Sequence, residues 1–226
     1  MQFEGRCIVV TGGGGGLGQS VVRWLAARGA EVTVPEYTDR SDLFDDLNNV
    51  TVVPGLDLTD EDVVTRFYGA QSTLWASVHL AGGFAMSPVL NTSLADFEHQ
   101  IRMNLVTAFL CSREAVRSMS DGGRIVNVTA RPAVETAVPG MLAYTTSKGA
   151  VAAMTRALAA ECLSKGILVN AIAPSIIDTP ANRAGMPSAD FGTWPKPEEL
   201  AQAIGFLISP ENRLTNGAIV PVYGQA

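Results

Sequence analysis

The sequence has few of the residues that usually build metal centres and disulfide bonds. Its 226 residues include only two histidines and three cysteines. The cysteines, Cys7, Cys111 and Cys162, are odd in number and lie in apolar stretches without metal-ligand spacing. We therefore expect no metal site, and we expect the cysteines to be reduced core residues of a cytoplasmic protein.

Basic residues and long apolar runs are also scarce. Lysine and arginine together number 16 against 22 acidic residues, which gives a formal net charge of −6. This balance argues against a nucleic-acid partner, because such a surface needs a basic face. No stretch reaches the roughly 18 apolar residues of a transmembrane helix, and residues 1–10 lack the pattern of a signal peptide. We therefore predict no membrane association.

What the sequence does contain is an alternation of short apolar runs and longer amphipathic stretches. The apolar runs predict buried parallel strands at residues 6–11, 31–34, 51–56, 74–80, 124–128, 168–172 and 219–222. Helical spacing predicts helices at residues 17–28, 60–70, 94–119, 142–164 and 197–208, and Thr59 is expected to cap the second helix. Residues 174–196 read as irregular. The alternation predicts an α/β fold, a single Rossmann-type domain over residues 1–226 with a doubly wound parallel sheet of about seven strands.

A glycine-rich segment separates the first predicted strand from the first predicted helix. Residues 11–18 read Thr-Gly-Gly-Gly-Gly-Gly-Leu-Gly. Glycine permits a tight turn and a close approach of the backbone to a pyrophosphate at the helix N-terminus. A flexible linker is the alternative, but a linker would not lie directly between a buried strand and an amphipathic helix. We expect the following residues to bind the pyrophosphate of a dinucleotide: Thr11, Gly12, Gly16, Leu17 and Gly18.

Tyr144 and Lys148 form a second motif. They are four residues apart, so they share one face of the predicted helix at residues 142–164. A fixed ammonium favours the charged form of a nearby phenol, which predicts a lowered pKa for Tyr144 and a role in proton transfer. Taken alone, such a pair also occurs by chance on many helices.

Both motifs resemble those of the short-chain dehydrogenase/reductase family, whose loop reads T-G-x-x-x-G-x-G and whose catalytic motif is Tyr-x-x-x-Lys. Further matches follow in the family's order along nearly the whole chain: Asp57, Ala81-Gly82-Gly83, Asn104 and Pro174. The resemblance implies an NAD(P)-dependent oxidoreductase in which Tyr144, Lys148 and Asn104 are catalytic. Lys148 would bind the nicotinamide ribose, and Asn104 would anchor a water that feeds protons to it.

The resemblance also implies cofactor contacts after the predicted strands. These are Asp57 and Leu58 at the adenine, Ala81, Gly82 and Gly83 after the fourth strand, Pro174 at a turn, and Ile177 and Thr179 at the carboxamide. A substrate lid is expected at residues 176–196.

Glu36 bears on the choice of cofactor. It follows the second predicted strand, where a carboxylate accepts hydrogen bonds from the adenosine ribose and repels a 2′-phosphate. NADH is therefore the preferred cofactor, with NADPH as the alternative if Arg40 turns toward a phosphate.

One catalytic residue of the family is missing. Ala130 stands where the family has a serine that donates a hydrogen bond to the substrate oxygen, and Leu80 replaces an asparagine. Thr129 would need a bulge to substitute, because consecutive strand residues point to opposite faces. Whether Thr129 or a water donates this hydrogen bond in place of the serine stays open.

The absence of the serine favours a delocalised acceptor, since a single developing oxyanion needs a second donor more. The dihydropteridine reductase branch of the family shows this departure, and the lid residues here are similar to that branch. We expect reduction of a quinonoid dihydropterin or similar ring. The residues expected to flank or face it are Phe84, Ala130, Met141, Met186 and Trp194.

Two alternatives to this substrate stay open. The first is a general carbonyl reductase, acting on ketones or 3-oxoacyl compounds, or an alcohol dehydrogenase. The second is a catalytically silent protein that senses a dinucleotide. The family also implies a homodimer or homotetramer, formed through the two long helices predicted at residues 94–119 and 142–164.

Overall fold

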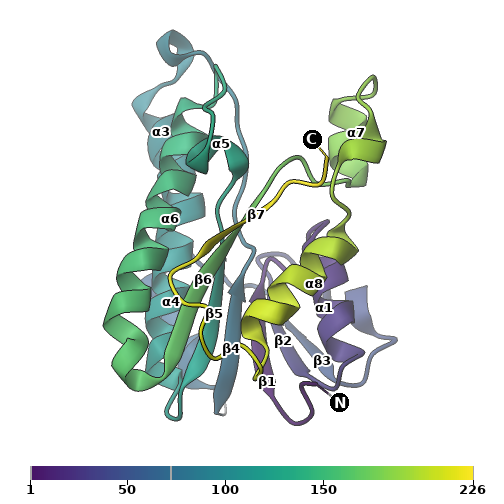
Figure 1. The fold of residues 1–226 in the computed structure, drawn as a ribbon, viewed down its shortest axis with the longest axis vertical. Coiled ribbons are helices and arrows are strands. Elements are labelled where there is room, and N and C mark those ends of the chain that lie inside the picture. The colour runs from purple at the N-terminus through teal and green to yellow at the C-terminus, as the bar shows by residue number, and fades with distance from the viewer. Residues whose placement is uncertain (1, 72, 226) are drawn as a thin grey trace.

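Seven parallel strands form the centre of the fold (Figure 1). The structure is a computed structural model that describes residues 2–71 and 73–225. The strands are β1 (Cys7–Thr11), β2 (Glu31–Pro35), β3 (Val50–Val53), β4 (Leu74–His79), β5 (Gly123–Val128), β6 (Ile167–Pro174) and β7 (Ile219–Val222). Their order in the sheet is β3-β2-β1-β4-β5-β6-β7. The chain thus winds outward in both directions from β1 and β4, which confirms the predicted doubly wound α/β fold, and ligands bind at the carboxyl edge of this junction.

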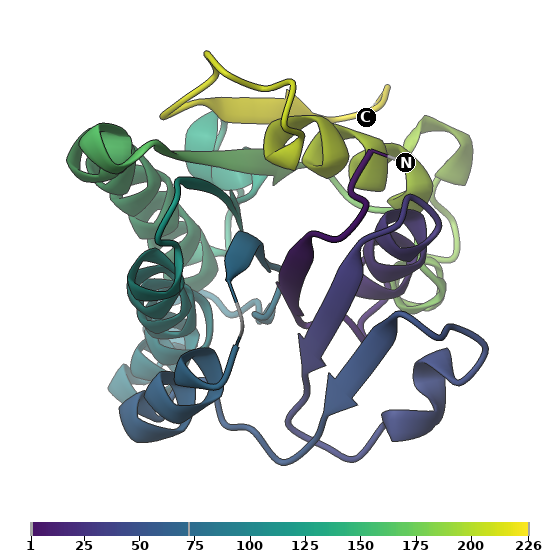
Figure 2. The same cartoon turned by 90° about the horizontal axis from the view of Figure 1, so that it is seen from below.

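Helices cover both faces of the sheet (Figure 2). One face carries α1 (Gly18–Ala26) and α8 (Pro197–Ile208), and the other carries α2 (Glu61–Gly69), α4 (Thr107–Ser118) and α6 (Leu142–Cys162). All eight residues of β6 are buried, because a central parallel strand is covered on both sides. No helix in the described ranges is long and apolar enough to cross a membrane.

Three shorter helices lie toward the carboxyl edge of the sheet. They are α3 (Leu94–Ile101), α5 (Arg131–Val134) and α7 (Pro180–Gly185). In Figure 1, α3 and α5 stand on one side of this edge and α7 on the other, next to the C-terminal end. Residues 174–196 were expected to be irregular, but they include α7, which Thr179 caps by accepting a hydrogen bond from Asn182.

The long helix predicted at residues 94–119 forms, but its type changes in the middle. A π-helical segment, Arg102–Val106, separates α3 from α4 and contains Asn104. A single wider turn within an α-helix leaves helical spacing on either side, so the sequence pattern predicts one long helix and not the change of type. The cap of α2 was also predicted wrongly: Asp60, not Thr59, accepts the hydrogen bond, from the Val63 amide.

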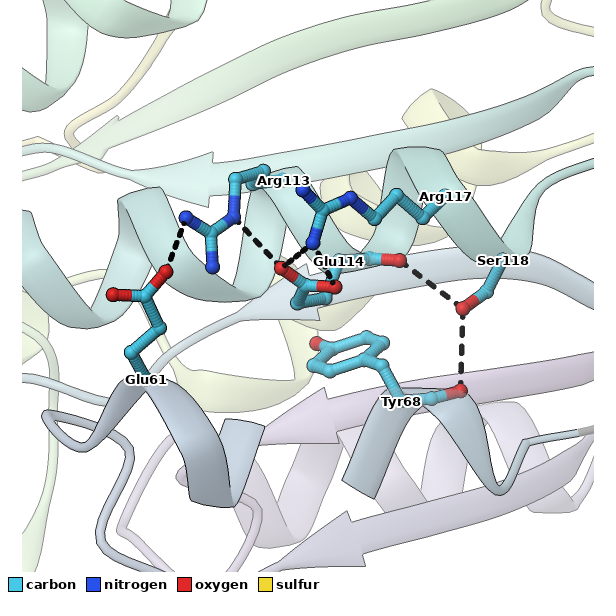
Figure 3. Close-up of polar contacts among 6 residues, drawn as sticks. All are labelled: Glu61, Tyr68, Arg113, Glu114, Arg117 and Ser118. Carbon is cyan, nitrogen blue, oxygen red and sulfur yellow. Dashed lines mark hydrogen bonds and ion pairs between the residues drawn. The ribbon is translucent and has the colours of Figure 1, made fainter. Parts of the chain in front are cut away.

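A buried charged cluster joins α2 to α4 (Figure 3). Glu114 is 3% exposed, and its carboxylate accepts hydrogen bonds at 2.7 Å from both Arg113 and Arg117. Arg113 also contacts Glu61 of α2 at 2.8 Å. The Ser118 hydroxyl donates to a backbone carbonyl of α2 at 3.2 Å. The cluster therefore compensates the charge of a buried acid while it fastens two helices together.

Candidate active site

The glycine loop is folded tightly against the end of β4. Gly12 has a φ of +67°, and a Cβ there would lie 2.7 Å from the Ala81 nitrogen. A Cβ on Gly18 would collide with the Gly12 carbonyl oxygen. The Thr11 hydroxyl accepts a hydrogen bond from the Ala81 amide at 3.2 Å. Glycine is therefore required at both positions, and the loop brings together the predicted cofactor residues that follow β1 and β4.

The N-terminus of α1 fits a phosphate group. It begins at Gly18, and in the described part of the chain no side chain caps it. By contrast, Asp60 caps α2 and Ser93 caps α3. Uncapped amides at the positive end of a helix dipole bind anions. Thr179 of the lid lies against this loop, since a Cβ on Gly16 would be 3.0 Å from its methyl carbon.

Glu36 and Arg40 both contact the glycine loop at Gly14. The Glu36 carboxylate accepts a hydrogen bond from the Gly14 amide at 2.7 Å, and the Arg40 guanidinium donates to the Gly14 carbonyl at 2.8 Å. The adenosine end of the predicted site therefore presents both a carboxylate and a guanidinium group. Asp57, expected at the adenine, accepts hydrogen bonds from the amide and hydroxyl of Thr59, each at 2.8 Å. Its neighbour Leu58 is buried.

Tyr144 and Lys148 lie one turn apart on α6, as predicted. Lys148 is 7% exposed, and its ammonium donates to the Val128 carbonyl at 3.0 Å. Burial lowers the pKa of Lys148 to about 8 and raises the pKa of Tyr144 to about 12. The expected lowering of the Tyr144 pKa by Lys148 is therefore wrong for this chain, because loss of water disfavours the charged form of each group.

Asn104 ties the π-helical segment to the loop after β4. Its side chain accepts a hydrogen bond from the Gly83 amide at 2.9 Å and donates to the Gly83 carbonyl at 3.0 Å. It also donates to the Ser147 hydroxyl at 3.0 Å, which in turn donates to the Tyr144 carbonyl at 2.7 Å. A Cβ on Gly82 would lie 2.5 Å from the Asn104 amide oxygen and 3.3 Å from the Lys148 ammonium. Three predicted residues thus meet at Gly82.

Sequence reasoning missed Ser147 and Gln100, which support this arrangement. Ser147 is fully buried, and Gln100 is 2% exposed and accepts from the Asn104 amide at 3.3 Å. Ser147 follows Tyr144 by three residues, so helical spacing alone could have pointed to it. Gln100 carried no comparable signal.

Thr129 does not replace the missing serine. Its hydroxyl is buried and donates to the Lys148 carbonyl at 2.7 Å, so it serves the backbone of α6. Ala130 at the serine position is 3% exposed and carries no donor. Of the described side chains assigned to proton transfer at the substrate oxygen, Tyr144 is thus the one hydroxyl donor.

The residues expected near the substrate come from separate segments of the chain. Phe84 is 57% exposed, and its ring stands edge-on to Tyr144 with centroids 4.9 Å apart. Met141 directly precedes α6, and Met186 follows α7. Trp194 was expected to flank a planar substrate, but it is 6% exposed and packs against another aromatic ring of the lid at 5.0 Å. That expectation is not met, because the lid packs on its own aromatic residues.

The segment predicted to form a lid keeps its first residues in contact with the core. Pro174 ends β6 inside the sheet, and Ile177 packs against the core cluster on the α1 side. The Thr179 amide donates to the Ile177 carbonyl at 2.8 Å. Two predicted carboxamide contacts, Ile177 and Thr179, therefore lie together between the end of β6 and the glycine loop.

Comparison with known proteins identifies the class of this arrangement. A family model described as Enoyl-(Acyl carrier protein) reductase matches residues 13–224. The solved structure of a short chain dehydrogenase/reductase family protein has a TM-score of 0.91 at 29% identity, covering 99% of this chain and 98% of that one. The chain therefore belongs to the short-chain dehydrogenase/reductase family, and it is an NAD(P)-dependent oxidoreductase.

Individual relatives bear on the expected substrate and on the choice of cofactor. A cis-4-hydroxycyclohexanecarboxylate dehydrogenase from Sinomonas cyclohexanicum is 33% identical, over 98% of this chain and 96% of its own length. The crystal structure of BdcA in complex with NADPH has a TM-score of 0.90 at 30% identity, covering 100% of this chain and 96% of that one. These findings lend no support to the narrower resemblance to dihydropteridine reductase. They also lend none to the preference for NADH.

Proposed function

We propose that this chain is an NADPH-dependent carbonyl reductase that interconverts a ketone and a secondary alcohol. The observation that carries the proposal is the convergence of Asn104 and Lys148 on Gly82, one helical turn from Tyr144. This arrangement belongs to the carbonyl-reducing members that the sequence resembles. The relative that oxidises a hydroxycyclohexanecarboxylate supports a ring alcohol or ring ketone as substrate.

The chain's own residues would hold the cofactor and move one proton. When bound, the reduced nicotinamide supplies a hydride to the carbonyl carbon. The Tyr144 phenol, whose pKa of about 12 keeps it protonated near neutral pH, donates its proton to the carbonyl oxygen as charge develops there. Lys148, Gly82 and Gly83 would hold the nicotinamide ribose, and the glycine loop with α1 would hold the pyrophosphate.

Arg40 supports NADPH as the cofactor. It already lies at Gly14, beside Glu36, where the adenosine ribose is expected, and a guanidinium binds phosphate through two parallel hydrogen bonds. We expect Arg40→Ala to raise the KM for NADPH about tenfold and to leave the KM for NADH unchanged. Steady-state kinetics with both cofactors measures this. A wild-type preference for NADH would instead assign the ribose to Glu36.

A quinonoid dihydropterin is the second candidate substrate. Ala130 offers no second donor to a ketone oxygen, and the exposed Phe84 ring next to Tyr144 suits a planar partner. The two candidate substrates are compared in one assay of NADPH consumption, with cyclohexanone as the ketone and with quinonoid dihydropterin. We expect faster turnover of the ketone. The opposite order would overturn the carbonyl reductase proposal in favour of the pterin.

Ala130→Ser sharpens this choice. A serine here restores the donor to the substrate oxygen, so we expect ketone reduction to rise roughly tenfold or more, as for an added oxyanion-hole donor. Reduction of a quinonoid ring, whose charge is spread, should change little. Equal effects on both substrates would mean that the position does not face the substrate oxygen.

We also propose that two or four copies assemble through α4 and α6. Phe109 of α4 is 44% exposed, which leaves a large apolar side chain at the surface of this helix. Sedimentation equilibrium is expected to give two or four times the 23.8 kDa of one chain. A mass of one chain at micromolar concentration would contradict the proposal.

A further inference from the structure

His79 is a buried titratable residue that the proposed mechanism does not use. It ends β4, is 4% exposed, and directly precedes Leu80 and the Ala81-Gly82-Gly83 loop. Ser77, two residues earlier on the same face of the strand, is fully buried, and Ser112 of α4 lies 3.3 Å from His79 Nδ1. Burial lowers the pKa of His79 to about 4, so its imidazole carries no charge at pH 7. A neutral imidazole has one N–H donor and one acceptor nitrogen, and its neighbours decide which is which.

A chain of hydrogen bonds runs through His79 from α2 to α6. The Tyr68 hydroxyl of α2 lies 2.8 Å from the Ser77 hydroxyl, which lies 2.8 Å from His79 Nε2. His79 Nδ1 lies 2.8 Å from the side-chain oxygen of Asn127, its partner in the pairing of β4 with β5. The Asn127 side-chain nitrogen donates to the Thr155 hydroxyl of α6 at 3.0 Å. We call these five residues the His79 chain.

The α6 end of the His79 chain fixes the direction of its hydrogen bonds. The Thr155 hydroxyl donates to the Val151 carbonyl at 2.8 Å, and a carbonyl can only accept. Thr155 therefore accepts from the Asn127 nitrogen, which leaves the Asn127 oxygen facing His79. His79 Nδ1 must then carry the proton, and Nε2 accepts from the Ser77 hydroxyl. Because every bond points toward α6, a break at one link affects the groups at the others.

The His79 chain ends on the helix face that carries Lys148. Thr155 follows Lys148 by two turns of α6, and both are buried. Asn127 holds Thr155, and the next residue, Val128, accepts a hydrogen bond from the Lys148 ammonium at 3.0 Å. Thr129 then donates to the Lys148 carbonyl at 2.7 Å. Three consecutive residues at the end of β5 therefore bind α6, and the side chain of the first is oriented by His79.

We propose that His79 is a positioning residue for Lys148 and Tyr144. This inference rests on the proposed function, in which Lys148 holds the nicotinamide ribose and Tyr144 donates the proton. His79 orients the Asn127 amide, which fixes the place of α6 on β5, and α6 carries both side chains. The strand that His79 ends also leads to Gly82, where a Cβ would lie 3.3 Å from the Lys148 ammonium. One strand thus sets both sides of this contact.

The kinetic test breaks the His79 chain at two links, with Thr155→Val and His79→Leu. We expect each variant to lower kcat for ketone reduction about tenfold, because a misplacement near 1 Å costs that much or more. The KM for NADPH should change little, since the glycine loop and α1 hold the pyrophosphate. The double variant should lose no more than either single variant, because both break the same chain. His79→Gln should keep its kcat, since its amide also donates and accepts.

Val126→Ala is the matched control for stability. Val126 precedes Asn127 in β5 but packs in the core cluster on the opposite face of the sheet. Alanine therefore loosens the same strand without touching the His79 chain, and we expect it to lower the urea midpoint and to keep kcat. Equal kcat values for Thr155→Val and Val126→Ala would show that the chain only stabilises the sheet, and would overturn the inference.

The tautomer of His79 tests the direction of the His79 chain. The sequence has two histidines, so His99→Gln leaves His79 as the one signal in nitrogen NMR of the imidazole ring. We expect the Nδ1–H tautomer at pH 7. Thr155→Val, made in the same background, lets the Asn127 amide turn over, so the Nε2–H tautomer should appear beside it. An Nε2–H tautomer without this substitution would contradict the chain.

The reactivity of Lys148 gives a readout that needs no turnover. Acetic anhydride modifies the neutral amine, so the rate of labelling against pH, followed by mass spectrometry, gives the pKa of Lys148. We expect about 8 in the wild type and a higher pKa in Thr155→Val, because a displaced α6 readmits water to the ammonium.

The labelling result also separates this inference from the proposed function. A Lys148 pKa and a kcat that are both unchanged in Thr155→Val would overturn the role of His79. A raised Lys148 pKa in Thr155→Val, with a wild type that reduces no ketone, would support the positioning role and contradict the proposed function.

Discussion

The protein buries two ionisable side chains in opposite ways. Glu114 and Lys148 are 3% and 7% exposed, so both are nearly excluded from water. Two guanidinium groups hold the Glu114 carboxylate, each at 2.7 Å. Among the described residues, Lys148 has one hydrogen-bond acceptor, the neutral Val128 carbonyl at 3.0 Å.

This difference separates a structural charge from a functional one. A buried charge with opposite charges around it joins elements of the fold, as Glu114 joins α4 to α2. A buried ammonium with only a carbonyl destabilises the fold, and its pKa falls, here to about 8. Such a group is retained where a ligand or a reaction uses it. The contrast predicts opposite consequences for substitutions at the two positions.

The largest expected effect is on activity. Lys148→Met removes the group that binds the nicotinamide ribose, so we expect kcat/KM for ketone reduction to fall about a hundredfold or more. Glu114→Gln is the matched control at the structural charge, and its kcat/KM should stay within about threefold of wild type. NADPH consumption measures both. Comparable losses of kcat/KM at the two positions would contradict the distinction between a structural and a functional charge.

The next largest effect is on stability at Glu114. Glu114→Ala leaves two arginines without their shared partner, and loss of a buried pair costs about 3 kcal/mol or more. Because Arg117 is 62% exposed, we expect a smaller loss of about 2 kcal/mol in the free energy of unfolding. Urea denaturation measures it. An unchanged midpoint would show that the cluster does not stabilise the α2–α4 contact.

Lys148→Met should stabilise the fold. The pKa of Lys148 falls from its usual 10.5 to about 8, so the unfolded chain binds more protons between these pH values and stability rises with pH there. The destabilisation is therefore complete below about pH 8 and absent above about pH 10.5. At 1.36 kcal/mol per pKa unit, and allowing for the lost hydrogen bond, we expect a gain of about 2 kcal/mol at pH 7.

The same denaturation series at pH 7 and pH 10 checks the sign. The advantage of Lys148→Met over wild type should shrink as pH rises, while exposed Lys165→Met should show no such trend. A variant that is less stable than wild type at pH 7 would mean that the Val128 contact outweighs the loss of water.

The smallest expected effect is at Ser147. Ser147→Ala removes the hydroxyl that joins Asn104 to the carbonyl of Tyr144. A neutral hydrogen bond contributes about 1 kcal/mol, so we expect kcat to fall about fivefold with little change in KM. An equal fall in kcat and in affinity for NADPH would assign Ser147 to cofactor binding instead of alignment.

Much of the fold followed from the sequence because its signals are local. Buried parallel strands and amphipathic helices each leave a characteristic spacing of apolar residues in the sequence. The glycine loop forces a tight turn at residues 12–18. The spacing of Tyr144 and Lys148 fixed a shared helical face. These predictions needed no knowledge of which strand lies beside which.

The remainder of the site depends on contacts between distant segments. The π-helical segment around Asn104 has no distinct sequence signal, and the Thr129 hydroxyl contacts the α6 backbone only in the folded chain. The pKa of Tyr144 was predicted from one neighbour, whereas the loss of water on burial decides its direction. Arg40 reaches Gly14 across 26 positions of sequence.

The resemblance to dihydropteridine reductase came from short lid segments. Such segments reflect local packing, which Trp194 illustrates, since it is buried against another aromatic ring of the same segment. The identity of a substrate depends on groups brought together from several elements of the fold.

The most direct test of the central claim is the rate of NADPH oxidation with a ring ketone in wild type and in Tyr144→Phe. Phenylalanine keeps the ring against Phe84 and removes only the proton donor. We predict a fall of at least tenfold in kcat, as for loss of a general acid, with NADPH binding unchanged. An unchanged rate would show that Tyr144 does not protonate the substrate and would contradict the proposed mechanism.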